Sequence, residues 1–282
     1  MKNFKKYIAA LLIFVLALSL CSCSLIDRLK PAPAPETVRL TFPEGTTVIQ
    51  AAQKLEEGGV CTKDEFISAV NNTERDNKFV KAINNPQERP FLLEGYIYPD
   101  TYDFYKGENA SSVIRTFLNN FQKKWTDDYQ KKADALNMSV DDIIKLASII
   151  EKEAADATQM PLVSSVLHNR LNKPGLYPSL QCDSTADYIN DYIAKNVTNA
   201  TELAAYTSRY STYKCEGLPV GAICNPGNDS INAALNPAKT DYYFFAHDTN
   251  KKIYLAKNDS ERQANNIAIL QANQKAAKSA SQ

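Results

Sequence analysis

The chain has 282 residues with 32 Lys and Arg against 32 Asp and Glu, and its 15 Tyr, 11 Phe and single Trp exclude a disordered or low-complexity protein. This length suits one large domain or two modest ones, and the balanced charge argues against a nucleic-acid-binding protein. Only two His are present, His168 and His247, so we expect no His-built metal site and no cofactor.

Residues 1–30 have the pattern of an export signal or a membrane anchor. Three Lys among the first six residues precede an uncharged run from Tyr7 to Ile26. Because about 20 apolar residues just span a bilayer, length leaves a cleaved signal and an uncleaved anchor open. Within the run, Leu20-Cys21-Ser22-Cys23 resembles a bacterial lipobox, which makes Cys23 the candidate lipidation site. The basic flank predicts that the rest of the chain lies outside the cytoplasm, attached to the cell membrane.

The other cysteines leave the disulfide state open. An exported chain can form disulfides, but the sequence does not give their connectivity, and free thiols are an equal alternative. These cysteines are Cys61, Cys182, Cys215 and Cys224.

A short linker and a small module are predicted next. Residues 31–36 are rich in Pro and predict a stiff, extended linker. Residues 37–85 are predicted to form a small binding module, in which a strand over 38–42 precedes two short helices. Thr46 or Thr47 can cap the first helix, and the second is expected to start near Thr62.

The remainder of the chain predicts a larger domain of mixed helices and strands, so the expected fold class is α+β. Helices are expected where apolar residues recur with helical spacing, and a hairpin of two buried strands where aromatic runs flank a turn. The polar end of the chain is expected to fray. The boundaries are 86–270 for this domain, 110–124, 126–136, 140–155 and 163–171 for its main helices, 242–246 and 253–255 for the hairpin, and 271–282 for the tail.

The best candidates for catalysis are two carboxyl groups on the helix expected over 140–155. Glu151 and Glu153 lie about 80° to either side of its apolar stripe, so the periodicity does not choose between them. A carboxyl group at such an edge, lining an apolar cleft, would have a raised pKa and could act as a general acid near neutral pH. On this segment alone, two ordinary surface Glu flanking Lys152 are the simpler interpretation.

Two nucleophile patterns are weaker. Ser211-Thr212-Tyr213-Lys214 matches the Ser-x-x-Lys motif of penicillin-binding enzymes, but its companion motifs crowd into about thirty residues, too few for that fold. Cys182 could form a nucleophilic pair with His168 or His247, yet no surrounding pattern supports a thiolate.

Three groups of motifs, in this order and spacing, resemble the endolytic murein transglycosylase family (MltG or YceG-like). The resemblance covers about Val38 to Asn266, and the anchor agrees with it, as does the small module, which resembles the family's LysM-like subdomain. The motifs are Glu94 to Tyr102; Ala147 to Glu153, followed by Val166 to Leu171 and Leu180 to Thr185; and Tyr210 to Tyr213, followed by Gly217 to Gly227.

The resemblance implies cleavage of the β-1,4 bond between N-acetylmuramic acid and N-acetylglucosamine within nascent glycan strands. The family's catalytic Glu corresponds to Glu153, which would act alone as acid and then base and leave 1,6-anhydro-muramic ends. The implied partners are peptidoglycan strands, the cytoplasmic membrane and penicillin-binding synthases. Candidate substrate-binding residues, each with a turn or packing role as the alternative, are Gln181, Asp183, Tyr213 and Asn225.

The chain departs from the family pattern at a few positions that spare Glu153. Ser184 and Val220 stand where the family commonly has Pro, and Cys182 stands where it has Ser. After its last strands the family tends to carry His, where this chain has Ile253-Tyr254 and Glu261-Arg262.

Two other functions stay open at this point. One is a muramidase-type hydrolase, with Glu153 as acid and Asp183 or Asp100 as base. The other is a non-catalytic peptidoglycan-binding protein.

Overall fold

The structure is a computed structural model that describes residues 36–280, apart from residues 73 and 75. The chain divides into two units, Met1–Glu36 and Thr37–Gln282, and the description below concerns the second. The predicted anchor with Cys23 lies outside the described residues, as does almost all of the Pro-rich linker. Over the range that is described, no helix is both long and apolar enough to cross a membrane.

The first part of the described chain contains the strand and two helices that the sequence predicts. Strand β1 (Thr37–Phe42) is followed by α2 (Val48–Glu57) and α3 (Lys63–Val70). Both helices begin with a capping box, in which a Thr side chain and the side chain three residues later satisfy each other's backbone N–H groups. These Thr are Thr47 and Thr62, and Thr47 rather than Thr46 is the cap of α2.

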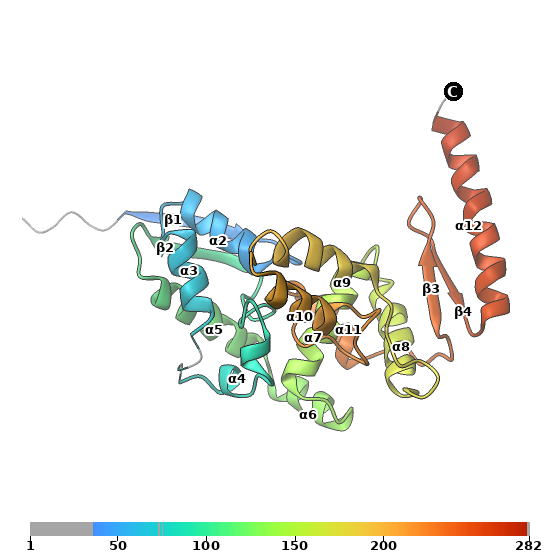
Figure 1. Cartoon of the computed structure of the whole chain (residues 1–282), viewed down its shortest axis with the longest axis horizontal. Coiled ribbons are helices and arrows are strands. Elements are labelled where there is room, and N and C mark those ends of the chain that lie inside the picture. The colour runs from blue at the N-terminus through green and yellow to red at the C-terminus, as the bar shows by residue number, and fades with distance from the viewer. Residues whose placement is uncertain (1–35, 73, 75, 281–282) are drawn as a thin grey trace, which may run out of the picture. The chain divides into compact units, whose positions relative to one another are not determined.

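The partner of β1 comes from the other side of the predicted boundary at residues 85 and 86. Strand β2 (Asp100–Tyr105) pairs with β1 in an antiparallel register that sets Thr37 opposite Tyr105 and Phe42 opposite Asp100 (Figure 1). The inward side chains of this two-stranded sheet meet aromatic residues of α5 (Ala110–Lys124). The segment 37–85 and the domain that follows it therefore share a sheet and a core.

Helix α7 (Val140–Glu153) lies at the centre of the larger part. Its residues from Ile143 to Ile150 are all buried, and α6 (Asp127–Ala135), α8 (Met160–Leu171) and α11 (Asn228–Leu235) pack against it. The sequence predicted this helix to within two residues. The shorter elements around it are α4 (Lys78–Lys81), a 3₁₀ turn (Pro86–Glu88), α9 (Asp183–Tyr188), a π turn (Ile189–Ile193) and α10 (Ala200–Tyr210).

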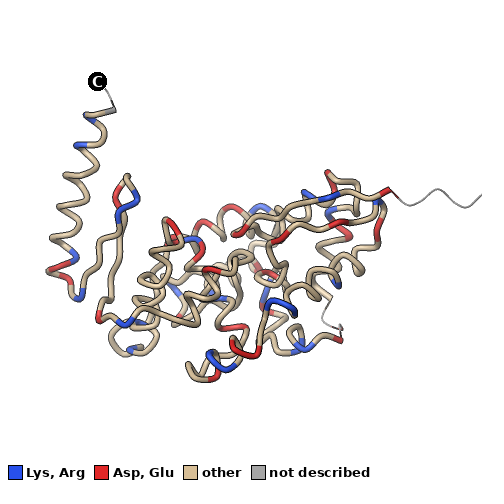
Figure 2. Tube along the Cα trace, turned by 180° about the vertical axis from the view of Figure 1, so that it is seen from behind, with Lys and Arg blue, Asp and Glu red and all other residues tan. Residues whose placement is uncertain are grey.

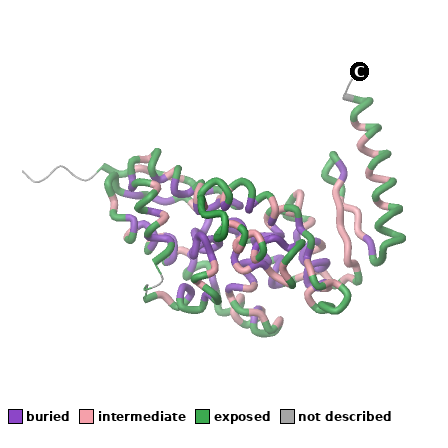
Figure 3. The backbone as a smooth tube through the Cα atoms, in the orientation of Figure 1, coloured by how far each residue is buried: buried purple, intermediate pink, exposed green. Residues whose placement is uncertain are grey.

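The C-terminal part is a hairpin covered by a long helix. Strands β3 (Phe244–His247) and β4 (Ile253–Ala256) pair antiparallel, and α12 (Asp259–Ala280) packs along both. The prediction of two buried strands was wrong, because Ala256 is the only buried residue of β3 and β4 and their other residues are half-buried (Figure 3). The prediction of a frayed tail was also wrong, because α12 continues to Ala280.

The charged residues are interspersed along the described chain (Figure 2). Helices α2, α3, α6, α7, α10 and α12 carry charges of both signs, and some opposite charges pair within one helix, such as Lys132 with Asp128 and Lys145 with Asp142. The described surface therefore carries positive and negative charges side by side. The fold itself is a mixed α+β arrangement.

Candidate active site

Helix α7 carries both candidate glutamates in its last turn, and it is anchored at its other end. Ser139 forms a capping box with Asp142, while the buried carboxylate of Asp141 accepts hydrogen bonds from Arg89 and from the Tyr96 hydroxyl. A buried charge of this kind is tolerated only when it is paired and hydrogen-bonded, so these contacts fix the start of α7 in place. Because α7 is one continuous helix, fixing its start also sets the position of its C-terminal end, where the two glutamates lie.

Glu153 is half-buried and faces the start of α9. Its Oε1 accepts a hydrogen bond of 2.7 Å from the Ser184 hydroxyl and one of 3.2 Å from the Ser184 backbone N–H. Burial raises the pKa of Glu153, the negative charges of Asp183 and Asp187 raise it further, and the bonds from Ser184 oppose them. The net pKa is raised, as the sequence predicted for a carboxyl group at this edge, which favours the protonated acid.

Glu151 faces a different segment. Its Oε2 accepts a hydrogen bond of 3.1 Å from the Gly227 backbone N–H, just before α11. Between the two glutamates, the Lys152 ammonium donates to the Gly45 carbonyl at 2.7 Å. The structure therefore separates two side chains that periodicity could not distinguish, and of the two glutamates only Glu153 bonds the segment that carries Gln181 and Asp183.

Three of the predicted substrate-binding residues lie on that segment or next to it. Gln181 and Asp183 are exposed, and Asp183 accepts a hydrogen bond of 2.6 Å from the hydroxyl of Tyr213, which is 52% exposed. This bond raises the pKa of Tyr213 to about 12, so the phenol keeps its proton. The Gln181 N–H, on a residue with a φ of 54°, donates to the Thr212 carbonyl at 2.9 Å. Together these three exposed residues are the polar rim, of which Asp183 and Tyr213 interact electrostatically with Glu153.

Buried hydroxyl groups hold this rim together. The Thr212 hydroxyl accepts from the Cys182 N–H at 2.9 Å, and the Thr185 hydroxyl donates to the Cys182 carbonyl at 2.8 Å. All three residues are buried. The segment 181–185 is thereby tied to the segment 211–213, which brings Ser184 to Glu153.

Asn225 requires a correction. The sequence predicted that it binds substrate, but it is fully buried and its amide is used within the protein. Its Oδ1 accepts from the backbone N–H groups of Gly95 and Ile97 at 2.9 and 2.8 Å. Its Nδ2 donates to the Thr46 carbonyl and to Glu94 at 2.8 and 3.1 Å. Asn225 therefore holds the loops behind the site and does not contact a ligand.

With this geometry established, comparison with known proteins identifies the family. The model of the YceG-like family matches residues 15–267. The chain belongs to the YceG-like family.

The relatives of this YceG-like chain carry one name. The endolytic murein transglycosylase of Streptococcus pneumoniae serotype 2 is 28% identical over 253 residues, which cover 82% of this chain and 44% of that protein. The endolytic murein transglycosylase of Bacillus subtilis is 27% identical over 247 residues, which cover 83% of this chain and 66% of that protein. The YceG-like chain thus spans less than half of the pneumococcal relative and about two thirds of the Bacillus relative.

A solved structure agrees with the fold. The crystal structure of a YceG-like protein from Listeria monocytogenes superposes with a TM-score of 0.65 at 31% identity, covering 82% of this chain and 75% of that one.

Sequence reasoning missed two residues of the YceG-like chain near the site. Ser184 lies directly beside the predicted Asp183, and it is one of the two positions in this motif, with Cys182, at which the chain departs from the family pattern. Glu94 is fully buried and accepts hydrogen bonds from the Val48 N–H at 3.0 Å and the Tyr188 hydroxyl at 3.0 Å, besides the one from Asn225. A Glu within the apolar stretch from Leu92 to Tyr98 was the signal for a buried carboxyl group that needs partners.

The nucleophile patterns find no support in the structure. Cys182 is buried and its pKa is raised well above the ordinary value by burial and by Glu153, so the thiol is inert. Neither described His contacts it, because His168 bonds the Ala234 carbonyl and His247 bonds Gln159. The hydroxyl-bearing residue of the Ser-x-x-Lys match, Ser211, is buried. All four cysteines in the described part of the chain are free thiols.

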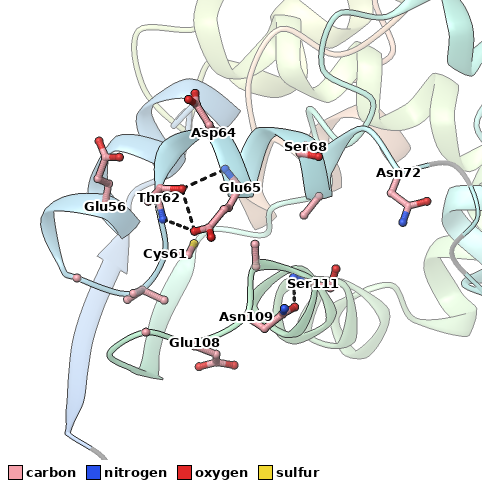
Figure 4. Close-up of a pocket in the computed structure, with 15 residues that line it drawn as sticks. Glu56, Cys61, Thr62, Asp64, Glu65, Ser68, Asn72, Glu108, Asn109 and Ser111 are labelled. Atoms are coloured by element: carbon pink, nitrogen blue, oxygen red, sulfur yellow. Dashed lines mark hydrogen bonds between the residues drawn. The ribbon is translucent and has the colours of Figure 1, made fainter.

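A separate groove of about 1000 Å³ lies between α3 and the start of α5 (Figure 4). Glu65 in its wall closes the capping box of α3, while Glu56 and Glu108 accept from the backbone N–H groups of Lys63 and Tyr105. These carboxylates are helix and turn caps. The groove therefore offers no catalytic group comparable with Glu153.

Proposed function

We propose that this YceG-like chain is an endolytic peptidoglycan lytic transglycosylase. It cuts the β-1,4 bond that follows N-acetylmuramic acid inside glycan strands and leaves 1,6-anhydro-muramic ends. The names of its relatives support the reaction, and one observation supports the residue. That observation is Glu153, a half-buried carboxyl group of raised pKa beside an exposed rim of polar side chains.

In the proposed mechanism, Glu153 acts twice. Protonated Glu153 donates its proton to the glycosidic oxygen while the bond from C1 of the muramic acid to that oxygen breaks, through an oxocarbenium-like state. The resulting carboxylate then takes the proton of the C6 hydroxyl as the C6 oxygen bonds to C1 and closes the anhydro ring. The proton count of Glu153 is restored and no water is consumed. The raised pKa supports the first step, because the acid must hold its proton near neutral pH.

The exposed rim is proposed to hold the sugar. Gln181 and Asp183 can bond sugar hydroxyls, and the exposed ring of Tyr213 offers a flat apolar face to a pyranose. These are groups that a glycan site needs, and they come from segments that are fastened together below the surface.

A muramidase-type hydrolase is the second candidate, because one further carboxylate lies close enough to act on Glu153. Asp183 raises the pKa of Glu153 through its charge, so it could activate a water molecule as a base. Asp100, the other base considered from the sequence, bonds Asn120 and its own neighbour Thr101 instead.

The placement of the enzyme is also a proposal. Residues 1–30 are proposed to anchor the chain to the cell membrane, as a lipoprotein lipidated at Cys23 or as a signal anchor, with 31–36 as linker. Residues 37–85 would contribute a LysM-like part that shares its sheet and core with the catalytic domain, 86–270, and both would lie outside the cytoplasm. The basic and apolar pattern of the N-terminus supports this arrangement. Work on nascent strands would place the enzyme beside penicillin-binding synthases.

The test is to digest purified glycan strands with the full-length chain and to identify the new ends by mass spectrometry. Anhydro-muramic ends would support the transglycosylase. Reducing muramic ends would show a hydrolase, and strands that are bound but not cut would show a binding protein.

A further inference from the structure

The two oxygens of the Glu153 carboxyl group have different surroundings. Oε1 accepts both hydrogen bonds from Ser184, at 2.7 Å from its hydroxyl and 3.2 Å from its backbone N–H. Oε2 accepts no hydrogen bond from any residue in the described part of the chain. The carboxyl group is therefore held on one side and left open on the other.

A carboxyl oxygen that accepts two hydrogen bonds is a poor place for a proton. A proton on Oε1 would point at two donors, and one of these bonds would have to break. The proton is therefore carried by Oε2. We propose that Ser184 is a positioning residue, which holds Oε1 so that Oε2 of Glu153 alone donates and then recovers the catalytic proton.

This inference rests on the proposed function. It adds to that function the identity of the reacting atom and of the residue that fixes it. One oxygen then performs both proton transfers, so the carboxyl group does not rotate between the two steps.

The backbone around Ser184 is built to keep it in place. The neighbours Cys182 and Thr185 are buried, and the Thr185 hydroxyl bonds the Cys182 carbonyl at 2.8 Å. The Cys182 N–H and the Thr185 hydroxyl both contact the Thr212 hydroxyl, at 2.9 and 3.0 Å. Because these contacts are independent of Ser184, removing its hydroxyl leaves the surrounding segment fastened.

The negative charges near Glu153 raise its pKa, and the hydrogen bonds from Ser184 act in the opposite direction. Asp183 and Asp187 on α9 raise the pKa of Glu153, in addition to burial, while the Cys182 thiol and the Tyr213 phenol also interact with it but stay neutral near pH 7. The bonds from Ser184 stabilise the carboxylate and lower the pKa. Loss of the hydroxyl bond would leave the proton more tightly held, and Oε1 would keep only the weaker bond from the backbone N–H to discourage protonation there.

The experiment compares Ser184→Ala and Ser184→Thr with the wild-type chain at full length. The pKa of Glu153 is measured without substrate, by ¹³C NMR of chains labelled at the glutamate carboxyl carbon and assigned with Glu153→Gln. Cleavage of glycan strands is then followed against pH. The matched control is Ser208→Ala, which removes an exposed serine hydroxyl on α10 that bonds only the Ala205 carbonyl.

Ser184→Ala is expected to raise the pKa of Glu153 and to move the alkaline limb of the activity profile to higher pH. It is expected to lower kcat about tenfold or more with little change in KM, since a hydrogen bond to a charged group is lost. Ser184→Thr, which keeps a hydroxyl, is expected to stay near the wild type in both measurements, as is Ser208→Ala.

A Glu153 pKa that is unchanged or lower in Ser184→Ala would overturn the proposal, as would an unchanged kcat. The titration needs no turnover, so it judges the role of Ser184 even if the wild type leaves glycan strands intact. In that case it is the transglycosylase function that fails.

Discussion

Burial raises the pKa of Glu153 most, and opposing neighbours on one short segment adjust it. Asp183 and Asp187 favour its protonated form by charge repulsion, and Ser184 favours its ionised form by hydrogen bonding. Both kinds of neighbour lie within five residues of one another, on α9. Single substitutions there are therefore expected to move the pKa of Glu153 in either direction.

Neutralising Asp183 is expected to have the effect opposite to the loss of the Ser184 hydroxyl. In Asp183→Asn the repulsion between two carboxylates is removed, so the pKa of Glu153 falls and the acid loses its proton at lower pH. The alkaline limb of the cleavage profile is expected to shift to lower pH. Asp187→Asn is the matched control, because it removes a charge without touching the bond from Tyr213, and it should shift the limb in the same direction. A shift upward in both variants would contradict this electrostatic account.

For single residues, the sequence predicted which residue types lie near the site better than it predicted the residues that they contact. Glu151 and Glu153 both lie at the edge of the apolar stripe, and only their contacts with Gly227 and Ser184 distinguish them. Asn225 lies among Pro and Gly, which is typical of an exposed turn, yet the turn is buried and the side-chain amide bonds backbone groups of Gly95, Ile97 and Thr46. Such contacts join residues that are far apart in the chain, so no local pattern reports them.

Among the elements, the loops behind α7 are joined by Asn225 and Glu94. Asn225 connects the turn before α2, the turn at Gly95 and its own loop through four hydrogen bonds. Gly95 has a φ of 94°, and a side chain there would collide with Ile144 on α7. The backbone at Gly95 therefore packs directly on the helix that presents Glu153.

Asn225→Ala is expected to destabilise the protein by about 3 kcal/mol, because it leaves buried N–H and C=O groups without partners. The free energy of unfolding, from denaturant titration, checks this. Asn232→Ala, at an exposed position of α11, is the control and should change stability by less than about 0.5 kcal/mol. Equal effects of the two substitutions would show that the buried amide is not a fastening point.

Glu94 predicts a pH dependence of stability. Burial raises its pKa from 4.5 to about 8, against the lowering effects of the hydrogen bonds from Val48 and Tyr188. Between these values the folded protein holds a proton on Glu94 that the unfolded chain has released, so this contribution to stability is full below pH 4.5 and is lost as the pH rises to about 8.

The stability difference between wild type and Glu94→Gln, measured from pH 4.5 to pH 8, should follow this course, because Gln does not titrate. The wild type should lose stability relative to the variant as the pH rises. A relative gain over the same range would mean that the buried group is a carboxylate throughout.

The helices were the elements that the sequence predicted best. Caps are local signals: the structure confirms Thr47 and Thr62, and Ser139 begins α7 in the same way. The hairpin was located within two residues but its burial was overestimated, since burial depends on what covers a strand. The long helix α12 was not predicted, because its polar, Ala-rich sequence has no apolar stripe that would indicate a helix.

For the whole molecule, the pairing of β1 with β2 means that the N-terminal segment is held by the same core that carries α7. The sequence placed a boundary between residues 85 and 86 because a polar stretch lies there. Pairing between strands sixty residues apart leaves no local signal, so it could not be predicted. The N-terminal segment of the YceG-like chain thus contributes to the scaffold that presents the site.

The central claim is that Glu153, and not Glu151, is the acid and base of the reaction. The most direct measurement is the yield of anhydro-muramic ends from purified glycan strands, by mass spectrometry, for the full-length wild type, Glu153→Gln and Glu151→Gln. We predict that Glu153→Gln loses about a hundredfold or more of the cleavage rate, since general acid–base catalysis is removed, while Glu151→Gln still accepts the Gly227 N–H and stays active. Wild-type yield from Glu153→Gln, with loss of product in Glu151→Gln, would contradict the account.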